Sequence, residues 1–313
     1  MTHDAIVVGG SFAGLSAAMQ LARARRRVLV IDAGRPRNRF AHASHGFLGQ
    51  DGRAPGAIVE DARAQVLAYP TAEFVAGEAE QARRAEDGFE VALASGEVLR
   101  AARLVLATGV TDELPEVEGL RERWGVTVLH CPYCHGYEVA DGRLGVLATS
   151  PMSMHQALLV PDWSARVTLF TNGAFTPDAE QRAALDARGV RVEERPVQAL
   201  LGPTPRLEGV RLADGETVPL DALFTASRTR MASPLAEQLG CAFDEGMNGP
   251  IVRTSELKET TVPGVYAAGD AIRAMHNATL ASADGVLAGI AAHRSMIPEL
   301  HAPAGPPPPT PPR

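Results

Sequence analysis

The first 32 residues alternate between two apolar strands and a helix, and this order constrains the fold more than any other feature of the chain. Residues 5–8 and 28–31 are short apolar runs of the kind found in buried parallel strands. Residues 15–25 carry apolar side chains at helical spacing. The glycine-rich sequence GGSFAG lies between the first strand and the helix, at 9–14. This context makes a glycine motif a candidate dinucleotide site.

The residues of this turn have separate expected roles. Gly9 permits the tight turn and Gly14 lets the helix pack close to the strand, so that the helix N-terminus faces a pyrophosphate. Gly10 and Ser11 lie between them, and Ser11 replaces the usual middle glycine of the motif. Asp32, at the end of the second strand, is placed to bind ribose hydroxyls. The alternative is an ordinary tight turn between strand and helix.

A second motif lies in mid-chain, where Cys131 and Cys134 are separated by two residues and flanked by His130 and His135. Such a pair can close a small disulfide at a helix start, where backbone N–H groups favour the thiolate. The imidazoles can take and return thiol protons near neutral pH. A zinc half-site has the same spacing, but no second cysteine or histidine pair completes four ligands. Redox chemistry is therefore the favoured interpretation.

Two later segments identify the nucleotide. An apolar strand at 104–106 leads into Ala107, Thr108 and Gly109, and another at 264–268 leads into Gly269 and Asp270. With the N-terminal motif, this order resembles the FAD-dependent disulfide reductases. The resemblance implies a bound FAD, with Thr108 and Gly109 in its site and Asp270 on the ribityl chain. It further implies that the backbone at Ala278 and Thr279, which starts a helix, faces the flavin ring.

The position of the cysteine pair, after the Ala-Thr-Gly segment in a chain of 313 residues, resembles low-molecular-weight thioredoxin reductases. The motif itself, Cys-x-x-Cys-His-Gly after a histidine, is similar to that of the dithiol oxidases that close disulfides in gliotoxin- and holomycin-type natural products. The resemblance implies that Cys131 exchanges with substrate and Cys134 faces the flavin. It also implies that His130 and His135 deprotonate substrate thiols and that the protein is a homodimer.

The middle of the chain supports the oxidase resemblance. An apolar strand at 144–148 is in the right place to open a nicotinamide-binding unit, but no glycine lies between Gly145 and Gly173, and no arginine cluster follows the next strand at 167–172. NADPH is therefore not the expected electron source, and dioxygen, giving hydrogen peroxide, is the simplest acceptor. A thioredoxin-reductase-like enzyme with NADPH or another donor remains open, as does a flavin-bearing redox sensor.

These motifs predict an α/β protein with two Rossmann-like three-layer domains. We expect the FAD domain at 1–112 and 230–300, a degenerate NADPH-like domain carrying the cysteine pair at 113–229, and a proline-rich disordered tail at 301–313. The crossover strands are expected within 111–119 and 227–234.

Charge and composition limit the partners. A net charge of −7 argues against nucleic acid, and no apolar run reaches membrane-spanning length. We expect a small-molecule dithiol and O2 as partners. With no signal peptide visible and only three cysteines, we expect a cytoplasmic location, with Cys241 as a buried structural thiol.

Overall fold

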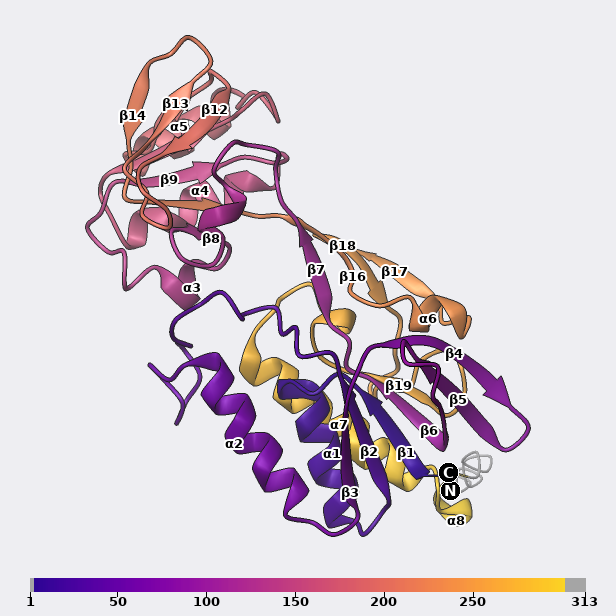
Figure 1. Cartoon of the computed structure of the whole chain (residues 1–313). Coiled ribbons are helices and arrows are strands. Elements are labelled where there is room, and N and C mark those ends of the chain that lie inside the picture. The colour runs from indigo at the N-terminus through magenta and orange to yellow at the C-terminus, as the bar shows by residue number, and fades with distance from the viewer. Residues whose placement is uncertain (1–2, 302–313) are drawn as a thin grey trace, which may run out of the picture.

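The computed structural model describes residues 3–301 and has two lobes joined by a narrow two-stranded connection (Figure 1). The connection consists of β7 (Val110–Glu113) and β16 (Arg228–Met231), which pair in antiparallel fashion. These strands overlap the segments 111–119 and 227–234.

The first lobe is built on a seven-stranded sheet in the order β3-β2-β1-β6-β5-β4, with β19 also paired to β6. Strands β3, β2, β1, β6 and β19 run parallel, whereas β4 and β5 are antiparallel. Both faces of the parallel part are covered, which explains why its strands are continuous apolar runs. The strands are β1 (His3–Val8), β2 (Val28–Asp32), β3 (Ala72–Ala76), β4 (Ala79–Ala85), β5 (Gly88–Leu93), β6 (Val98–Leu106) and β19 (Val265–Ala267).

Helices α1 (Phe12–Arg23) and α7 (Ala278–Arg294) pack against each other on one face of this sheet, and α2 (Pro55–Leu67) lies beside α1. A side chain at Gly285 would come within 2.0 Å of the Ala13 carbonyl oxygen, so the two helices approach at backbone distance. The first helix was expected to reach Arg25 but ends at Arg23, because Arg25 has a φ of 62°.

The other face of the first sheet packs on segments that follow the second crossover. These are α6 (Leu235–Gln238), β17 (Phe243–Gly246) and β18 (Gly249–Val252), and buried Leu235, Cys241 and Val252 belong to the core on that side. Cys241 is a free, buried thiol, as the sequence predicted, and burial raises its pKa.

The second lobe contains a five-stranded parallel sheet in the order β11-β10-β9-β15-β8, with a three-stranded antiparallel sheet, β12-β13-β14, beside it. Helices α4 (Ser153–Leu159) and α5 (Ala179–Ala187) belong to this lobe, and the short helix α3 (Pro132–His135) lies on its side toward the first lobe. The strands are β8 (Val128–Leu129), β9 (Leu144–Leu147), β10 (Val167–Phe170), β11 (Arg191–Glu193), β12 (Val197–Leu201), β13 (Gly209–Leu212), β14 (Thr217–Pro219) and β15 (Ala222–Thr225).

Each lobe is therefore a Rossmann-like α/β unit, as the sequence predicted, and the first is assembled from both ends of the chain. Short 3-10 turns η1 (Arg121–Arg123), η2 (Val160–Asp162) and η3 (Gly269–Ile272) and a last helix, α8 (Pro298–His301), complete the elements. The expected disordered tail falls almost wholly outside the described residues. Within residues 3–301, no helix is both long and apolar enough to span a bilayer.

Candidate active site

The turn after β1 is shaped so that two of its glycines have no room for a side chain. A Cβ on Gly9, whose φ is 108°, would lie 2.2 Å from the Ala107 carbonyl oxygen. A Cβ on Gly14 would lie 1.7 Å from the Gly9 carbonyl oxygen. The strand, the turn and the helix therefore approach closely only with glycine at both positions. In this arrangement the N-terminus of α1 lies at the turn. This backbone cradle fits the pyrophosphate of FAD.

The acid at the end of β2 is held in place by the same turn. The Gly10 amide donates a hydrogen bond to Asp32 Oδ1 at 2.9 Å, and Ser11 occupies the N-cap position of α1. Beyond Asp32 lies a cavity of about 240 Å³ between the ends of β2 and β3, which includes Gly34, Phe74 and Gly77 in its lining. This position, next to a dinucleotide turn, fits the adenosine part of FAD.

The expected flavin side of the cofactor site lies at the ends of β6 and β19. Gly109, with a φ of 67°, follows Thr108 just beyond the end of β6, and Asp270 is the second residue of the turn η3 after β19. Asp270 is not alone: Arg37 Nη1 lies 3.2 Å from its Oδ2. Ala278 opens α7, but the Thr279 amide already donates to Asn277 Oδ1 at 2.8 Å. Of the two predicted amides, that of Ala278 is therefore the better placed to meet a flavin oxygen.

The cysteine pair forms a disulfide, with Cα atoms 5.3 Å apart, at the start of α3. Cys131 is the N-cap, and the Cys134 amide lies 3.1 Å from Cys131 Sγ as a hydrogen-bond donor. The same amide would stabilise a thiolate on Cys131 after reduction. The backbone before the motif is fixed by Gln156, whose Nε2 donates to the His130 carbonyl at 2.8 Å.

The two histidines beside the disulfide have different surroundings. His130 is partly buried, with its Nδ1 shielded from solvent, and burial, reinforced by Arg37, lowers its pKa to about 4. Burial also lowers the pKa of His135, while the nearby Glu138 opposes that change. Both imidazoles are therefore neutral at neutral pH and able to accept a thiol proton.

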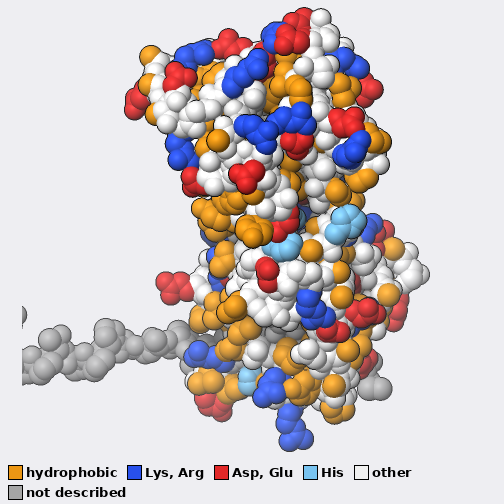
Figure 2. Space-filling view, turned by 90° about the vertical axis from the view of Figure 1, so that its left-hand side faces the viewer, with side chains coloured by type: hydrophobic (Ala, Val, Ile, Leu, Met, Phe, Trp, Pro, Cys, Tyr) orange, Lys and Arg blue, Asp and Glu red, His pale blue; other side chains and the backbone are white. Residues whose placement is uncertain are grey.

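The long segment between β2 and α2 meets the second lobe beside the cysteine helix (Figure 1). A Cβ on Gly125 would lie 2.7 Å from Phe40 Cβ, and His45 Nε2 lies 3.4 Å from a Glu138 carboxylate oxygen. Figure 2 shows hydrophobic and histidine side chains gathered on one face where the lobes meet. Tyr133 and Tyr137, within and just after the cysteine helix, are largely exposed, so a substrate can approach the disulfide along a partly apolar surface.

The position where a nicotinamide cofactor would bind in the second lobe has different chemistry. After β9, the Thr149 amide donates to Ser153 Oγ at 3.1 Å and the Thr149 hydroxyl donates to the Ala226 carbonyl at 2.6 Å. The turn through Pro151 and Met152 contains no glycine. Side chains and internal hydrogen bonds thus occupy a turn that would have to approach phosphate through its backbone.

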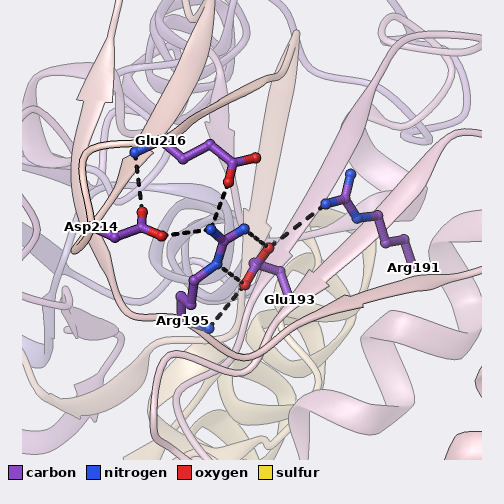
Figure 3. Close-up of polar contacts among 5 residues, drawn as sticks. All are labelled: Arg191, Glu193, Arg195, Asp214 and Glu216. Carbon is purple, nitrogen blue, oxygen red and sulfur yellow. Dashed lines mark hydrogen bonds and ion pairs between the residues drawn. The ribbon is translucent and has the colours of Figure 1, made fainter.

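The arginine nearest the end of this sheet is already neutralised. Arg195, just after β11, donates to Glu193, Asp214 and Glu216 at 2.6–2.8 Å (Figure 3). These carboxylates raise its pKa further above its ordinary value. The cluster fastens the β13–β14 hairpin to the parallel sheet and leaves Arg195 poorly suited to a nucleotide phosphate.

Several residues of this junction escaped the sequence analysis because they carry no local motif. Arg37 Nε and Nη2 donate to Asp112 at 2.8 and 2.5 Å, and Ser227 Oγ donates to the same carboxylate at 2.7 Å. His276, in the loop before α7, lies against His130 with ring centroids 6.4 Å apart. Within residues 3–301, no group of three or more His, Cys, Asp or Glu is arranged to hold a metal ion.

The chain is similar to known proteins in both sequence and structure. The family model for pyridine nucleotide-disulphide oxidoreductases matches residues 3–285. Thioredoxin reductase tcpT of Claviceps purpurea is 33% identical over 308 residues, covering 95% of each chain. An oxidoreductase from Agrobacterium tumefaciens has a similar structure, with a TM-score of 0.91, 51% identity and coverage of 95% of this chain and 99% of that one. The crystal structure of HlmI gives a TM-score of 0.89 at 42% identity, with 96% and 94% covered.

Proposed function

The chain belongs to the pyridine nucleotide-disulphide oxidoreductase family, as a thioredoxin-reductase-like, FAD-dependent thiol-disulfide oxidoreductase, and we propose that it works as a dithiol oxidase. In this role it closes a disulfide in a small-molecule dithiol and uses O2 as the electron acceptor. The observation that carries the proposal is the Cys131–Cys134 disulfide flanked by two imidazoles of lowered pKa. These are the groups needed to activate two substrate thiols in turn.

The first half of the reaction is thiol–disulfide exchange. His135 takes the proton of one substrate thiol, and the resulting thiolate attacks Cys131 Sγ. The Cys131–Cys134 bond breaks, so that Cys134 leaves as a thiolate and Cys131 holds the substrate as a mixed disulfide. The Cys134 amide, 3.1 Å from Cys131 Sγ, keeps the two sulfurs close together through this exchange.

The second half releases the product. His130 takes the proton of the second thiol, and this thiolate attacks the substrate sulfur of the mixed disulfide. The substrate disulfide forms and Cys131 leaves as a thiolate. Cys131 and Cys134 then return to the disulfide by giving up two electrons. FAD, when bound, would supply the two-electron chemistry that carries this pair to O2, which becomes hydrogen peroxide with the two protons taken from the substrate thiols. The sum is one dithiol and one O2 converted to one disulfide and one hydrogen peroxide.

The residues present fit FAD. Gly9, Gly10, Ser11 and Gly14 would hold the pyrophosphate and Asp32 the ribose. Thr108, Gly109 and Asp270 would hold the flavin half, with the Ala278 amide at the ring. A reductase using NADPH is the alternative, and it is favoured by the name of the relative from Claviceps purpurea, a thioredoxin reductase. Two observations argue against a reductase. The turn at 149–152 contains no glycine, and Arg195 is already hydrogen-bonded to three carboxylates.

We further propose residues 1–112 and 230–300 as the FAD domain and 113–229 as the central domain. The expected homodimer and cytoplasmic location remain part of the same proposal. Light scattering of the purified protein tests the dimer, which requires twice the chain mass of 33.0 kDa.

The test of function is a panel of small dithiols supplied to the purified yellow protein in air. We expect one O2 to be consumed and one hydrogen peroxide to form for each disulfide made. Cys131→Ser should show no such turnover. Absence of oxygen uptake with every dithiol, together with rapid turnover of NADPH and a disulfide, would establish the reductase instead.

A further inference from the structure

His276 is a histidine of the first lobe that faces the cysteine motif of the second. Its ring lies 6.4 Å from that of His130, centroid to centroid, with an angle of 33° between the planes. The two residues are far apart in sequence and come from different lobes, so the contact joins the start of the cysteine motif to the loop before α7. This separation is too long for a direct hydrogen bond between the rings but short enough for one small bridging group.

Both histidines have the same buried atom without a partner. Among the described residues, neither His130 Nδ1 nor His276 Nδ1 has a hydrogen-bond partner, although each atom is shielded from solvent. Buried polar atoms of this kind require an explanation because each unpaired one is costly. One such atom therefore lies on each ring of the histidine pair at the lobe junction.

The tautomer of His276 can be derived from its other nitrogen. Nε2 lies 3.0 Å from the Arg273 carbonyl oxygen, and a carbonyl only accepts, so Nε2 carries the proton. In the neutral ring, Nδ1 is then the unprotonated nitrogen and a base. The loop is held rigidly, since Arg273 is paired with the fully buried Asp284 of α7.

The charges around the pair keep both rings neutral before reaction. Burial lowers the pKa of His276, Arg37 lowers it further, and Asp270 and Asp112 oppose this change. Arg37 likewise lowers the pKa of His130, and Asp112 raises it. A proton arriving at His276 therefore meets Arg37 and two carboxylates, whereas one arriving at His130 meets Arg37 and Asp112.

We propose that His276 acts through His130, so that the proton which His130 takes from the second substrate thiol is shared with or passed to His276 before the cysteine disulfide closes again. This inference rests on the proposed dithiol oxidation. His276 is in this role a positioning residue rather than a catalytic one, because it works on the protonation of His130. It also assigns different tasks to the two flanking histidines, with His135 serving the first thiol from the side of Glu138.

The kinetic test is a double-mutant cycle with His130→Gln and His276→Gln in the FAD-loaded protein. Glutamine keeps a side-chain donor for the Arg273 carbonyl but does not titrate. Reduction of the flavin by dithiothreitol without oxygen should slow about tenfold or more in either variant, and the double variant should lose little further. His155→Gln, an exposed histidine on α4, serves as the matched control. Independent, multiplying losses, or a His276→Gln rate equal to the control's, would overturn the proposal.

A second readout needs no turnover. Deuterium exchange at the imidazole C2–H reports the pKa of each histidine in the resting holoenzyme. If the two rings act on each other, His276→Gln should shift the His130 pKa, whereas His155→Gln should leave it unchanged. An unchanged His130 pKa in His276→Gln would overturn the pairing. If the wild type is not reduced by any dithiol, the proposed function fails on its own, and the exchange measurement still decides whether the pair exists.

Discussion

Arg37 and Asp112 form a two-point ion pair between the segment after β2 and the first crossover strand, with donor–acceptor distances of 2.8 and 2.5 Å. A third nitrogen of the same guanidinium reaches Asp270, which lies 233 positions later in the chain. The carboxylate expected to hold the flavin is thus tied through one arginine to the strand on which the second lobe is mounted. This contact fixes the lobe that carries the disulfide relative to the cofactor site.

We predict that Arg37→Gln lowers the free energy of unfolding by about 3 kcal/mol, because it leaves the nearly buried Asp112 charge without its cation. The double variant Arg37→Gln/Asp112→Asn should recover part of this loss, since neither charge then remains. Denaturant unfolding of the holoenzyme measures both. Arg39→Gln, in the same loop but exposed, is the control, and an Arg37 variant as stable as this control would refute the argument.

A second prediction concerns acid stability. The His130 pKa is about 4 in the folded protein against an ordinary 6.5, so between these values the unfolded chain binds a proton that the folded chain does not. The free energy of unfolding therefore falls as the pH drops from 6.5 to 4. Over this whole pH range, His130 alone accounts for a loss of about 3 kcal/mol. Asp112 adds to the loss: burial raises its pKa, but the hydrogen bonds from Arg37 and Ser227 lower it overall.

Unfolding midpoints measured across this pH range check the prediction. His130→Gln should show a shallower acid dependence than the wild type, whereas His155→Gln should keep the wild-type slope. Identical slopes in all three proteins would mean that His130 is not held neutral by the fold.

The cysteine relay predicts different phenotypes for its two members. Cys131→Ser and Cys134→Ser should both bind FAD and both lose dithiol oxidation. Cys131→Ser retains the thiol expected at the flavin and should show a long-wavelength charge-transfer band. Cys134→Ser should lack the band and accumulate a mixed disulfide with substrate at Cys131, which intact mass spectrometry detects. Cys241→Ser, at the buried thiol of the first lobe, is the control and should behave as wild type. Peroxide formation near the wild-type rate in either active-site variant would exclude the relay.

The local motifs of the sequence were enough to predict the fold, because each depends on a few neighbouring residues. Gly9 and Gly14 are dictated by backbone contacts made within one turn, and Cys131 and Cys134 are close by covalent geometry. The apolar parallel strands were found for the same reason, with errors of one or two residues at most ends and of six at the start of β6. The end of α1 at Arg23 was missed because a run of basic residues indicates the last turn of a helix but not its final residue.

The junction between the lobes could not be predicted in this way. Arg37, Asp112 and His276 are ordinary polar residues in sequence, and their importance arises from contacts across 75 or more positions. Arg37 in particular lies in a loop with several other arginines, and only the fold shows which of them meets the buried carboxylate. The burial of His130, and hence its lowered pKa, likewise depends on the packing of both lobes.

The most direct test of the account is reduction of the bound flavin without oxygen, followed by stopped-flow absorbance in one protein preparation with two donors. We predict that a small dithiol bleaches the flavin rapidly, and that micromolar NADPH bleaches it very slowly or not at all, because the turn at 149–152 and the occupied Arg195 offer its phosphates no site. Rapid bleaching by NADPH with none by dithiols would contradict the dithiol oxidase and establish a reductase.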